Sequence, residues 1–169
     1  MRCARSVICE RLMIAVVALT AGACDRVAPV VQPMEFNHKR HHEAEVECST
    51  CHDQAADGPA ATLPPLRVCA KCHKEIQGKD PLPEKAIMEA VLAKKEVPWI
   101  QVNRMEGHVY FSHRVHVGFA EMKCEACHGQ MEKLERALVS SNVDHLTMEK
   151  CMSCHEAKGA NIDCIACHK

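Results

Sequence analysis

The sequence predicts a small, mostly α-helical fold with much irregular loop and little or no sheet. A five-residue pattern, Cys-x-x-Cys-His, occurs five times within 169 residues. Aromatic residues make up only 3% of the chain, which leaves little material for an ordinary side-chain core. The segments between the repeats have helical periodicity or are rich in Ala, Gly and Pro, and they show no sustained strand alternation.

The repeated pattern is typical of covalent haem c attachment. Two cysteines three residues apart lie on one side of a helical turn, and the histidine lies four residues after the first cysteine. Both sulfurs can therefore bond the vinyl groups of one porphyrin while the imidazole binds its iron. The motifs, numbered first to fifth, are Cys48, Cys51 and His52; Cys69, Cys72 and His73; Cys124, Cys127 and His128; Cys151, Cys154 and His155; and Cys164, Cys167 and His168.

Zinc sites and disulfides are the two other common uses of paired cysteines. Zinc would not require a histidine at the end of every copy, and disulfides would not require a constant spacing. The complete pattern therefore favours five covalent haems c. Because the chain is too short to enclose each haem in side chains, we expect the haems to form the core, with short helices and loops over them.

The charge of the chain argues against a nucleic-acid partner. The whole sequence carries 21 basic and 22 acidic side chains. Without residues 1–23 the balance is 18 to 21, and the propionates of the haems would add further negative charge. A clearly acidic holoprotein does not attract nucleic acid.

Residues 1–23 are typical of an export signal, with three arginines before an apolar stretch too short to span a bilayer as a stable helix. The small residues before Cys24 resemble a lipobox, in which the cysteine becomes the lipidated N-terminus after cleavage. Ordinary cleavage and an uncleaved anchor are the alternatives. The expected location is the periplasmic side of the cell membrane, with a lipid anchor.

The mature chain contains an internal duplication. The segment from Phe36 to His41 leads into the first motif as the segment from Phe111 to His116 leads into the third, with one extra residue in the second copy. The expected organisation is a signal peptide over 1–23, a lipid-anchored tether over 24–33 and a pentahaem domain over 34–169, divided into a haem-binding unit over 34–80, a connector over 81–107 and a trihaem unit over 108–169.

Secondary structure outside the motifs is expected in three places. The periodicity predicts a helix over 83–97 with Ile87 and Leu92 turned inward, and a second amphipathic helix over 130–139. A short hairpin within 99–110 is the only sheet that the sequence suggests.

Seven histidines remain after each motif has used one, enough to give every iron a second histidine ligand. A haem iron takes a sixth ligand unless its site is built to react. In each duplicated unit two histidines lie three residues apart, so their rings diverge and should serve different haems. Methionine is the rival ligand, from Met105, Met122 or Met148. The spare histidines are His38, His41, His42, His108, His113, His116 and His145.

The stretch Phe-Asn-His-Lys-Arg-His before the first motif resembles the class III multihaem cytochromes c. In that family the first histidine of the unit caps the haem of the next motif and the second caps a later haem. The resemblance implies His38 for the first haem, His113 for the third, His116 for the fourth and His145 for the fifth. The second haem then takes His41 or His108.

Residues 97–104, which lead into the segment 107–113, are similar to the pentahaem cytochrome subunit of alternative complex III and menaquinone reductase-type complexes. This resemblance implies electron transfer through five bis-histidine haems in a membrane-associated respiratory chain. The implied partners are an iron–sulfur or molybdopterin-type subunit and a polytopic quinol-binding subunit, with the membrane reached through the lipid anchor.

Three other functions compete with this one: a free tethered periplasmic electron carrier, a subunit of a haem wire, and a multihaem oxyanion reductase. A reductase needs an iron with an open position, whereas here the candidate ligands outnumber the irons. We therefore expect an electron carrier with no catalytic residues rather than an enzyme.

The mass of the mature protein should exceed that of the polypeptide by five covalently held haems, because each motif offers two thiols to one porphyrin. Intact mass spectrometry after extraction with acidified organic solvent measures this directly. Haem that leaves with the solvent, or zinc in its place, would contradict the prediction.

Overall fold

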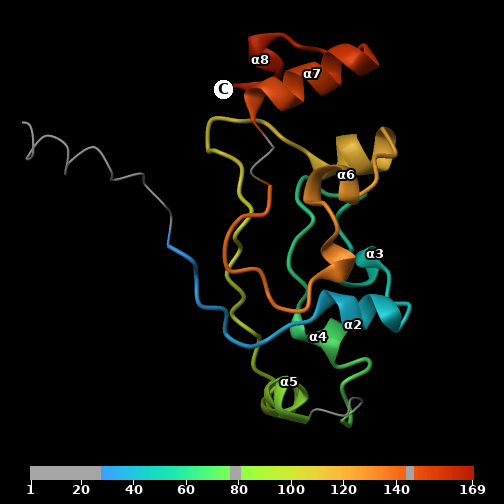
Figure 1. Cartoon of the computed structure of the whole chain (residues 1–169), viewed down its shortest axis with the longest axis vertical. Helices are drawn as coiled ribbons and strands as arrows, with labels where there is room; N and C mark the ends of the chain where they lie inside the picture. Colours follow the sequence, from blue (N-terminus) through green and yellow to red (C-terminus); the bar gives the residue numbers. More distant parts are fainter. Residues whose placement is uncertain (1–27, 77–80, 144–146) are drawn as a thin grey trace, which may run out of the picture.

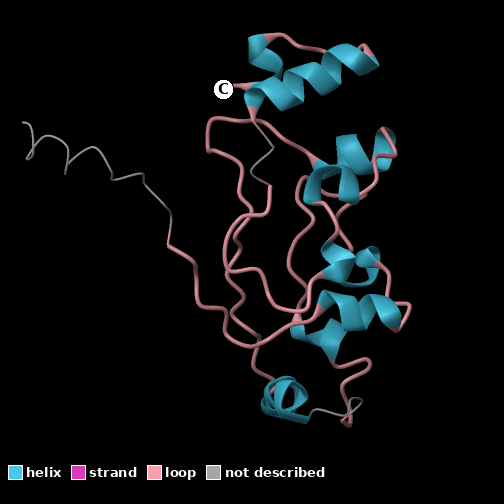
Figure 2. Cartoon of the chain, viewed as in Figure 1, coloured by secondary structure: helices cyan, strands magenta, loops and turns pink. Residues whose placement is uncertain are grey.

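The computed structural model describes residues 28–76, 81–143 and 147–169 (Figure 1). Within these ranges, short helices alternate with long loops and no strand occurs (Figure 2). The expected mostly helical fold is confirmed. The helices are α2 (His38–Glu43), α3 (Cys48–Cys51), α4 (Leu66–Cys69), α5 (Pro81–Ala93), the π-helix η1 (Arg114–Phe119), α6 (Glu125–His128), the 3-10 helix η2 (Met131–Lys133), α7 (Met148–Lys158) and α8 (Cys164–Cys167).

The molecule is elongated, and the helices follow one another along its long axis (Figure 1). Helix α5 lies at one end, and α7 and α8 lie at the other. Between them come α4, then α2 and α3, then α6. The order in space therefore differs from the order in the chain, because α4 and α5 lie beyond α2 and α3.

The expected hairpin within 99–110 is wrong for the described structure. Val109 forms an isolated antiparallel bridge with His168 instead, and the neighbouring amide of Tyr110 donates to the carbonyl of Cys167 at 2.7 Å. The segment thus pairs with the end of the chain rather than with itself.

The expected helix over 130–139 is also wrong. Only η2 forms, and the backbone becomes extended at Leu134. The amide of Lys39 donates to the carbonyl of Leu134 at 3.0 Å, and the amide of Val30 donates to the carbonyl of Val139 at 2.7 Å. In a helix these two carbonyls would accept from amides of the same helix, whereas here they accept from amides of a distant segment. The long-range hydrogen bonds therefore override the helical periodicity of the sequence.

Three extended segments are joined through the side chain of Gln32. Its amide nitrogen donates to the carbonyls of Ile100 at 2.9 Å and Leu138 at 2.8 Å, and its amide oxygen accepts from the amide of Ile100 at 3.1 Å. Farther along, Asn103 donates to the side chain of Asn142 at 2.7 Å. The connector and the segment after η2 are therefore fastened together.

Helix α5 is shorter than expected. It ends at Ala93, where Lys94 takes a left-handed conformation with φ of 50° and so stops the helix. Ile87 is buried at 8% exposure, as expected. The inward position expected for Leu92 is wrong, since its side chain is 81% exposed.

Side chains alone provide almost no core. Among the described residues, the buried apolar side chains are Leu66 and Ile87, where α4 packs against α5. Large apolar side chains such as Phe119 and Ile165 are 69% and 85% exposed. An ordinary domain of this length buries most of its apolar surface, so the helices are spaced for something other than side chains to lie between them.

No helix in the described ranges is long and apolar enough to cross a membrane. The expected export signal, lipidation site and start of the tether, at residues 1–27, lie outside the described residues.

Ile87→Ala should lower the free energy of unfolding by about 2–4 kcal/mol, because it opens a cavity where α5 packs on α4. Leu92→Ala, on the same helix, is the matched control and should change it by about 0.5 kcal/mol or less, because that side chain is exposed. Urea unfolding followed by circular dichroism measures both. Equal losses in the two variants would contradict the packing described here.

Candidate haem sites

Each cysteine motif forms one helical turn. In four of the five, the amide of the histidine donates to the carbonyl of the first cysteine at 2.9 Å; the fourth motif lies inside α7. Two thiols and one imidazole are thereby held on a single turn. The four histidines are His52, His73, His128 and His168.

The motif thiols are free in the structure. Burial raises the pKa values of the thiols of Cys48, Cys51, Cys69, Cys127 and Cys151. Burial therefore disfavours the thiolate form at these five cysteines.

Imidazole rings from different parts of the chain face the motif histidines in pairs. A metal–imidazole bond is about 2 Å long and the ring centre lies about 1 Å behind the nitrogen, so two rings on one iron have centroids roughly 6 Å apart. The observed separations are 6.1 Å for His41 and His73, 6.3 Å for His113 and His128, 6.1 Å for His116 and His155, and 5.4 Å for His108 and His168.

Three of these pairs match the separation required of two axial ligands. The pair at the fifth motif is closer, with rings nearly parallel at 12°, and would have to open slightly to admit an iron. At the first motif, burial, followed by the nearby His52 and His41, lowers the pKa of His38 to about 4. His38 is thus a neutral ring, the form that binds a metal, and His52 is among its electrostatic neighbours.

Backbone carbonyls fix the tautomer of four of these rings. The Nδ1 atoms of His41, His52, His116 and His155 lie 2.7–2.8 Å from carbonyl oxygens of Asn37, Thr62, Ser112 and Asn161, respectively. A carbonyl only accepts, so each Nδ1 carries the proton and Nε2 keeps its lone pair for a metal.

The rings of His38, His73 and His113 lack this support. Their Nδ1 atoms are buried without a hydrogen-bond partner. The first and second sites therefore each combine one ring whose tautomer a carbonyl fixes, His52 or His41, with one that has no such carbonyl. At the fourth site both rings are fixed.

A phenylalanine positions both distal rings in each duplicated unit. Phe36 stacks on His41 at 4.7 Å and meets His38 edge-on at 4.6 Å. In the second unit, Phe111 stacks on His116 at 4.6 Å and meets His113 edge-on at 5.0 Å. The phenylalanines are part of the repeated sequence pattern, but their role as ring supports emerges only from the fold.

Along the long axis the second, first and third motifs follow one another, and the fourth and fifth lie together at the end formed by α7 and α8 (Figure 1). Burial is the main cause that raises the pKa of the Cys51 thiol, and the nearby Cys69 is the second cause. For the Cys48 thiol, burial is again first and the nearby Cys124 is second. Thiols of the fourth motif likewise raise the pKa of Cys127. The cysteines of successive sites are thus close neighbours.

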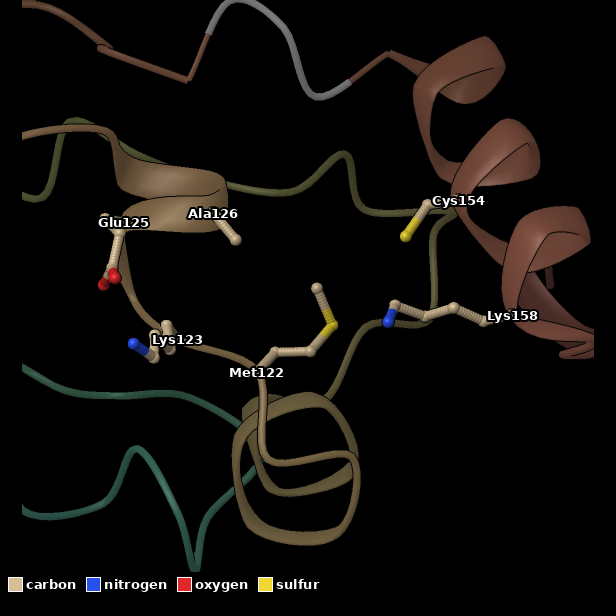
Figure 3. Close-up of a pocket in the computed structure, with 6 residues that line it drawn as sticks. All are labelled: Met122, Lys123, Glu125, Ala126, Cys154 and Lys158. Carbon is tan, nitrogen blue, oxygen red and sulfur yellow. The ribbon is translucent and has the colours of Figure 1, made fainter.

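A cavity of about 440 Å³ separates the third and fourth motifs (Figure 3). Cys154 of α7 faces it from one side, and Met122 and Ala126 face it from the other. Lys123 and Lys158 bring two cationic side chains to its wall. Met122, a rival ligand in the sequence, therefore lines the same cavity as Cys154 of the fourth motif.

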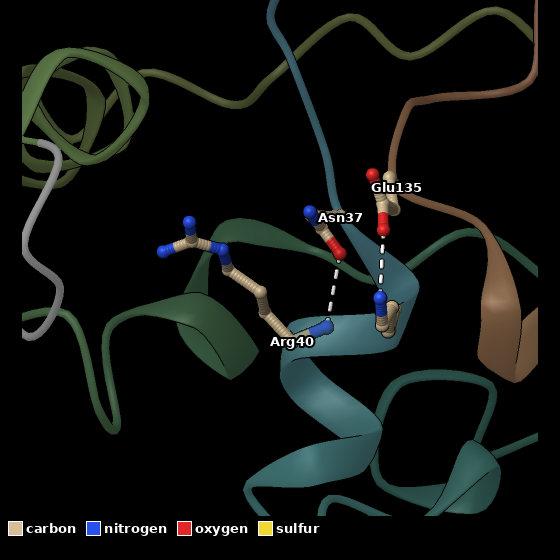
Figure 4. Close-up of polar contacts among 4 residues, drawn as sticks. Asn37, Arg40 and Glu135 are labelled. Atoms are coloured by element: carbon tan, nitrogen blue, oxygen red, sulfur yellow. Dashed lines mark hydrogen bonds and ion pairs between the residues drawn. The ribbon is translucent and has the colours of Figure 1, made fainter.

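Helix α2, which carries His38 and His41, is held by its own sequence and by one long-range contact (Figure 4). The Asn37 side chain caps the helix by accepting from the amide of Arg40 at 2.9 Å, as expected of asparagine at this position. Lys39 forms an ion pair with Glu135 at 2.7 Å, which ties the helix to the segment after η2.

Two histidines remain outside these pairs. His42 is exposed on α2. His145, expected to cap the fifth haem, lies outside the described residues, and the ring beside His168 belongs to His108. Between the two candidates for the second haem, the structure brings His41 to His73.

The donor set and the spacing fit haem c. Two thiols and one imidazole on each turn match the covalent attachment pattern, and paired rings about 6 Å apart match bis-histidine ligation of one iron. The near absence of a side-chain core among the described residues leaves room for bulky cofactors.

Comparison with known proteins agrees with this chemistry. The family model "Class III cytochrome C family" matches residues 16–98, and "Cytochrome c7 and related cytochrome c" matches residues 109–169. The chain is also 30% identical over 161 residues to the multiheme cytochrome c subunit of menaquinone reductase from Nitratidesulfovibrio vulgaris, covering 82% of this chain and 77% of that protein.

His108→Ala should open the iron at the fifth motif and His41→Ala the iron at the second, because each removes the ring that faces that motif histidine. Each variant should show one high-spin haem that binds carbon monoxide after reduction. His42→Ala, next to His41 on α2, is the control and should leave every haem low-spin. Optical and paramagnetic NMR spectra identify the altered haem. A change at the second haem in His108→Ala would overturn these pairings.

Proposed function

Because the chain belongs to the class III multihaem cytochromes c, an electron-transfer family, we propose that it carries five bis-histidine haems c and moves electrons within a quinone-linked membrane complex. The observation that carries the proposal is the set of imidazole pairs at separations near those of axial ligands. They belong to motifs that are spread along the long axis of the molecule.

In this proposal the ten motif cysteines attach the haems, and each motif histidine binds one iron. The second ligands are His38, His41, His113, His116 and His108 for the first, second, third, fourth and fifth haems, respectively. Carbonyls that accept from Nδ1, such as those of Thr62 and Asn161, hold rings in orientation and make Nε2 a better donor.

Bound at these sites, haem c supplies single-electron transfer between neighbouring irons in the order in which the sites lie. The chain contributes the spacing, the ligands and the degree of burial. Two histidine ligands give lower potentials than a histidine and a methionine, which suits exchange with a menaquinol-linked partner. The second and fifth motifs, at opposite ends of the row, are the natural points of entry and exit.

The relationship to a menaquinone reductase subunit supports a role within a membrane complex. We propose that the partners are a polytopic quinone-binding subunit and an iron–sulfur or molybdopterin-type subunit. The protein would act on the periplasmic side of the membrane, held there by lipidation of Cys24. In this role the protein carries electrons and performs no bond chemistry on a substrate.

Two other functions make different predictions. An oxyanion reductase needs one open iron, whereas the motif histidines of the second to fifth motifs each have a second ring within 6.3 Å, and His38 is an electrostatic neighbour of His52 in the first motif. A free carrier would form no stable complex with another protein. A homopolymeric wire would assemble from copies of this chain and would need no different subunit.

The full chain, solubilised from native membranes in mild detergent, should co-purify with a polytopic subunit and at least one iron–sulfur or molybdopterin subunit. A menaquinol analogue should reduce its haems in this assembly and not in the separated chain, because the quinone site belongs to a partner. Size-exclusion chromatography with mass spectrometry and optical spectra measures both.

A chain that leaves the membrane alone, with five low-spin haems, would instead identify a free carrier. Carbon monoxide binding by the unmodified, reduced protein at neutral pH would indicate an open iron and support a reductase.

A further inference from the structure

The two duplicated units differ at the turn that carries their distal histidines. The first unit forms the regular helix α2, whereas the second forms the π-helix η1. A π-turn accommodates one additional residue in a helix, and the second copy is one residue longer there. In η1 the amide of Ala120 donates to the carbonyl of Val115, five residues earlier, at 3.0 Å.

The start of η1 is capped by the other unit. The amides of His113 and Arg114 donate to the carbonyls of Pro59 at 3.0 Å and Gly58 at 2.9 Å. These first-turn amides have no partner within their own helix. In α2, by contrast, the Asn37 side chain provides the cap. The second unit is therefore fastened to the loop that follows the first motif.

The contact between η1 and the loop that contains Ala56, Gly58 and Pro59 forms a seam between the two units. Gly118 lies at the closest approach in this seam. A Cβ atom at Gly118 would lie 2.3 Å from the carbonyl oxygen of Ala56. Contacts of real Cβ atoms below 3.0 Å are essentially never seen, so a side chain would move the backbone of one unit by at least about 0.7 Å. Gly118 does not have a positive φ, so the requirement for glycine comes from this close approach.

The same loop also holds a ligand of the first site. The Nδ1 atom of His52 donates to the carbonyl of Thr62 at 2.7 Å. The loop therefore connects the proximal histidine of the first motif with the π-helix that follows His113, the distal histidine of the third.

We propose that Gly118 is a positioning residue, whose contact with the Ala56 carbonyl sets the separation between the first and third haem sites. This junction is where the two duplicated units meet, and the row of sites passes through it. The inference rests on the proposed function, because it assumes that the first and third motifs both carry haem.

The test compares Gly118→Ala and Gly118→Val with Gly107→Ala in the holoprotein. Gly107 is the matched control because a Cβ atom there would meet nothing within 4 Å. An NMR-monitored redox titration, read from resolved haem methyl signals, measures the interaction between each pair of neighbouring haems. Amide hydrogen exchange at His113 and Arg114 measures the seam without reference to redox state.

The redox interaction between the first and third haems should weaken progressively from glycine to alanine to valine, while that between the fourth and fifth stays unchanged. Amide exchange at His113 and Arg114 should accelerate in the same order. Gly107→Ala should behave as the unmodified protein. An unchanged interaction and unchanged amide exchange in Gly118→Val would overturn the inference.

Mass and optical spectra separate this inference from the proposed function. If the unmodified protein lacks five covalent low-spin haems, the proposed function fails. If the haems are present but the Gly118 variants match the control, only the seam inference fails. Should Gly118→Val not fold, deletion of Gly118 provides the second test. It restores the spacing of the first unit, so it should keep the ligation of His113 and His116 while the first–third interaction weakens.

Discussion

The structure depends on pairs of imidazole rings, from distant parts of the chain, that face one another with centroids 5.4–6.3 Å apart. A separation of roughly 6 Å leaves room for two metal–nitrogen bonds, and the helices and loops are arranged to maintain it. The described residues bury only two apolar side chains, Leu66 and Ile87, so packing of side chains cannot itself hold these rings in place. Capped turns, carbonyl acceptors and stacked phenylalanines do so instead.

The chain contains two copies of one histidine-bearing unit, and the two copies differ in how their helices are capped. The first carries its own cap at Asn37. The second takes its cap from the carbonyls of Gly58 and Pro59, and accommodates an extra residue as a π-turn. The first unit thus supplies the cap of its own helix, whereas the second is capped by its neighbour. The chain can thus be elongated without a continuous core.

The molecule is elongated, and its motifs are spread along the long axis (Figure 1). Motifs follow one another in space in an order that differs from the chain, because the second motif and α5 lie beyond the first (Figure 1). The extended segments joined through Gln32 run alongside and connect distant parts of the sequence. Electron transfer needs this kind of fixed spacing more than it needs a closed pocket.

The sequence by itself determined the cysteine motifs, the haem chemistry they indicate, the helical class and the duplicated unit, because these follow from local spacing. It could not determine that His108, rather than a residue near the fourth motif, lies beside His168, since that contact joins residues 60 positions apart. It also predicted a helix over 130–139, where hydrogen bonds from Val30 and Lys39 hold the chain extended. Only tertiary contacts decided ring pairing, the order of the sites and the need for glycine at position 118.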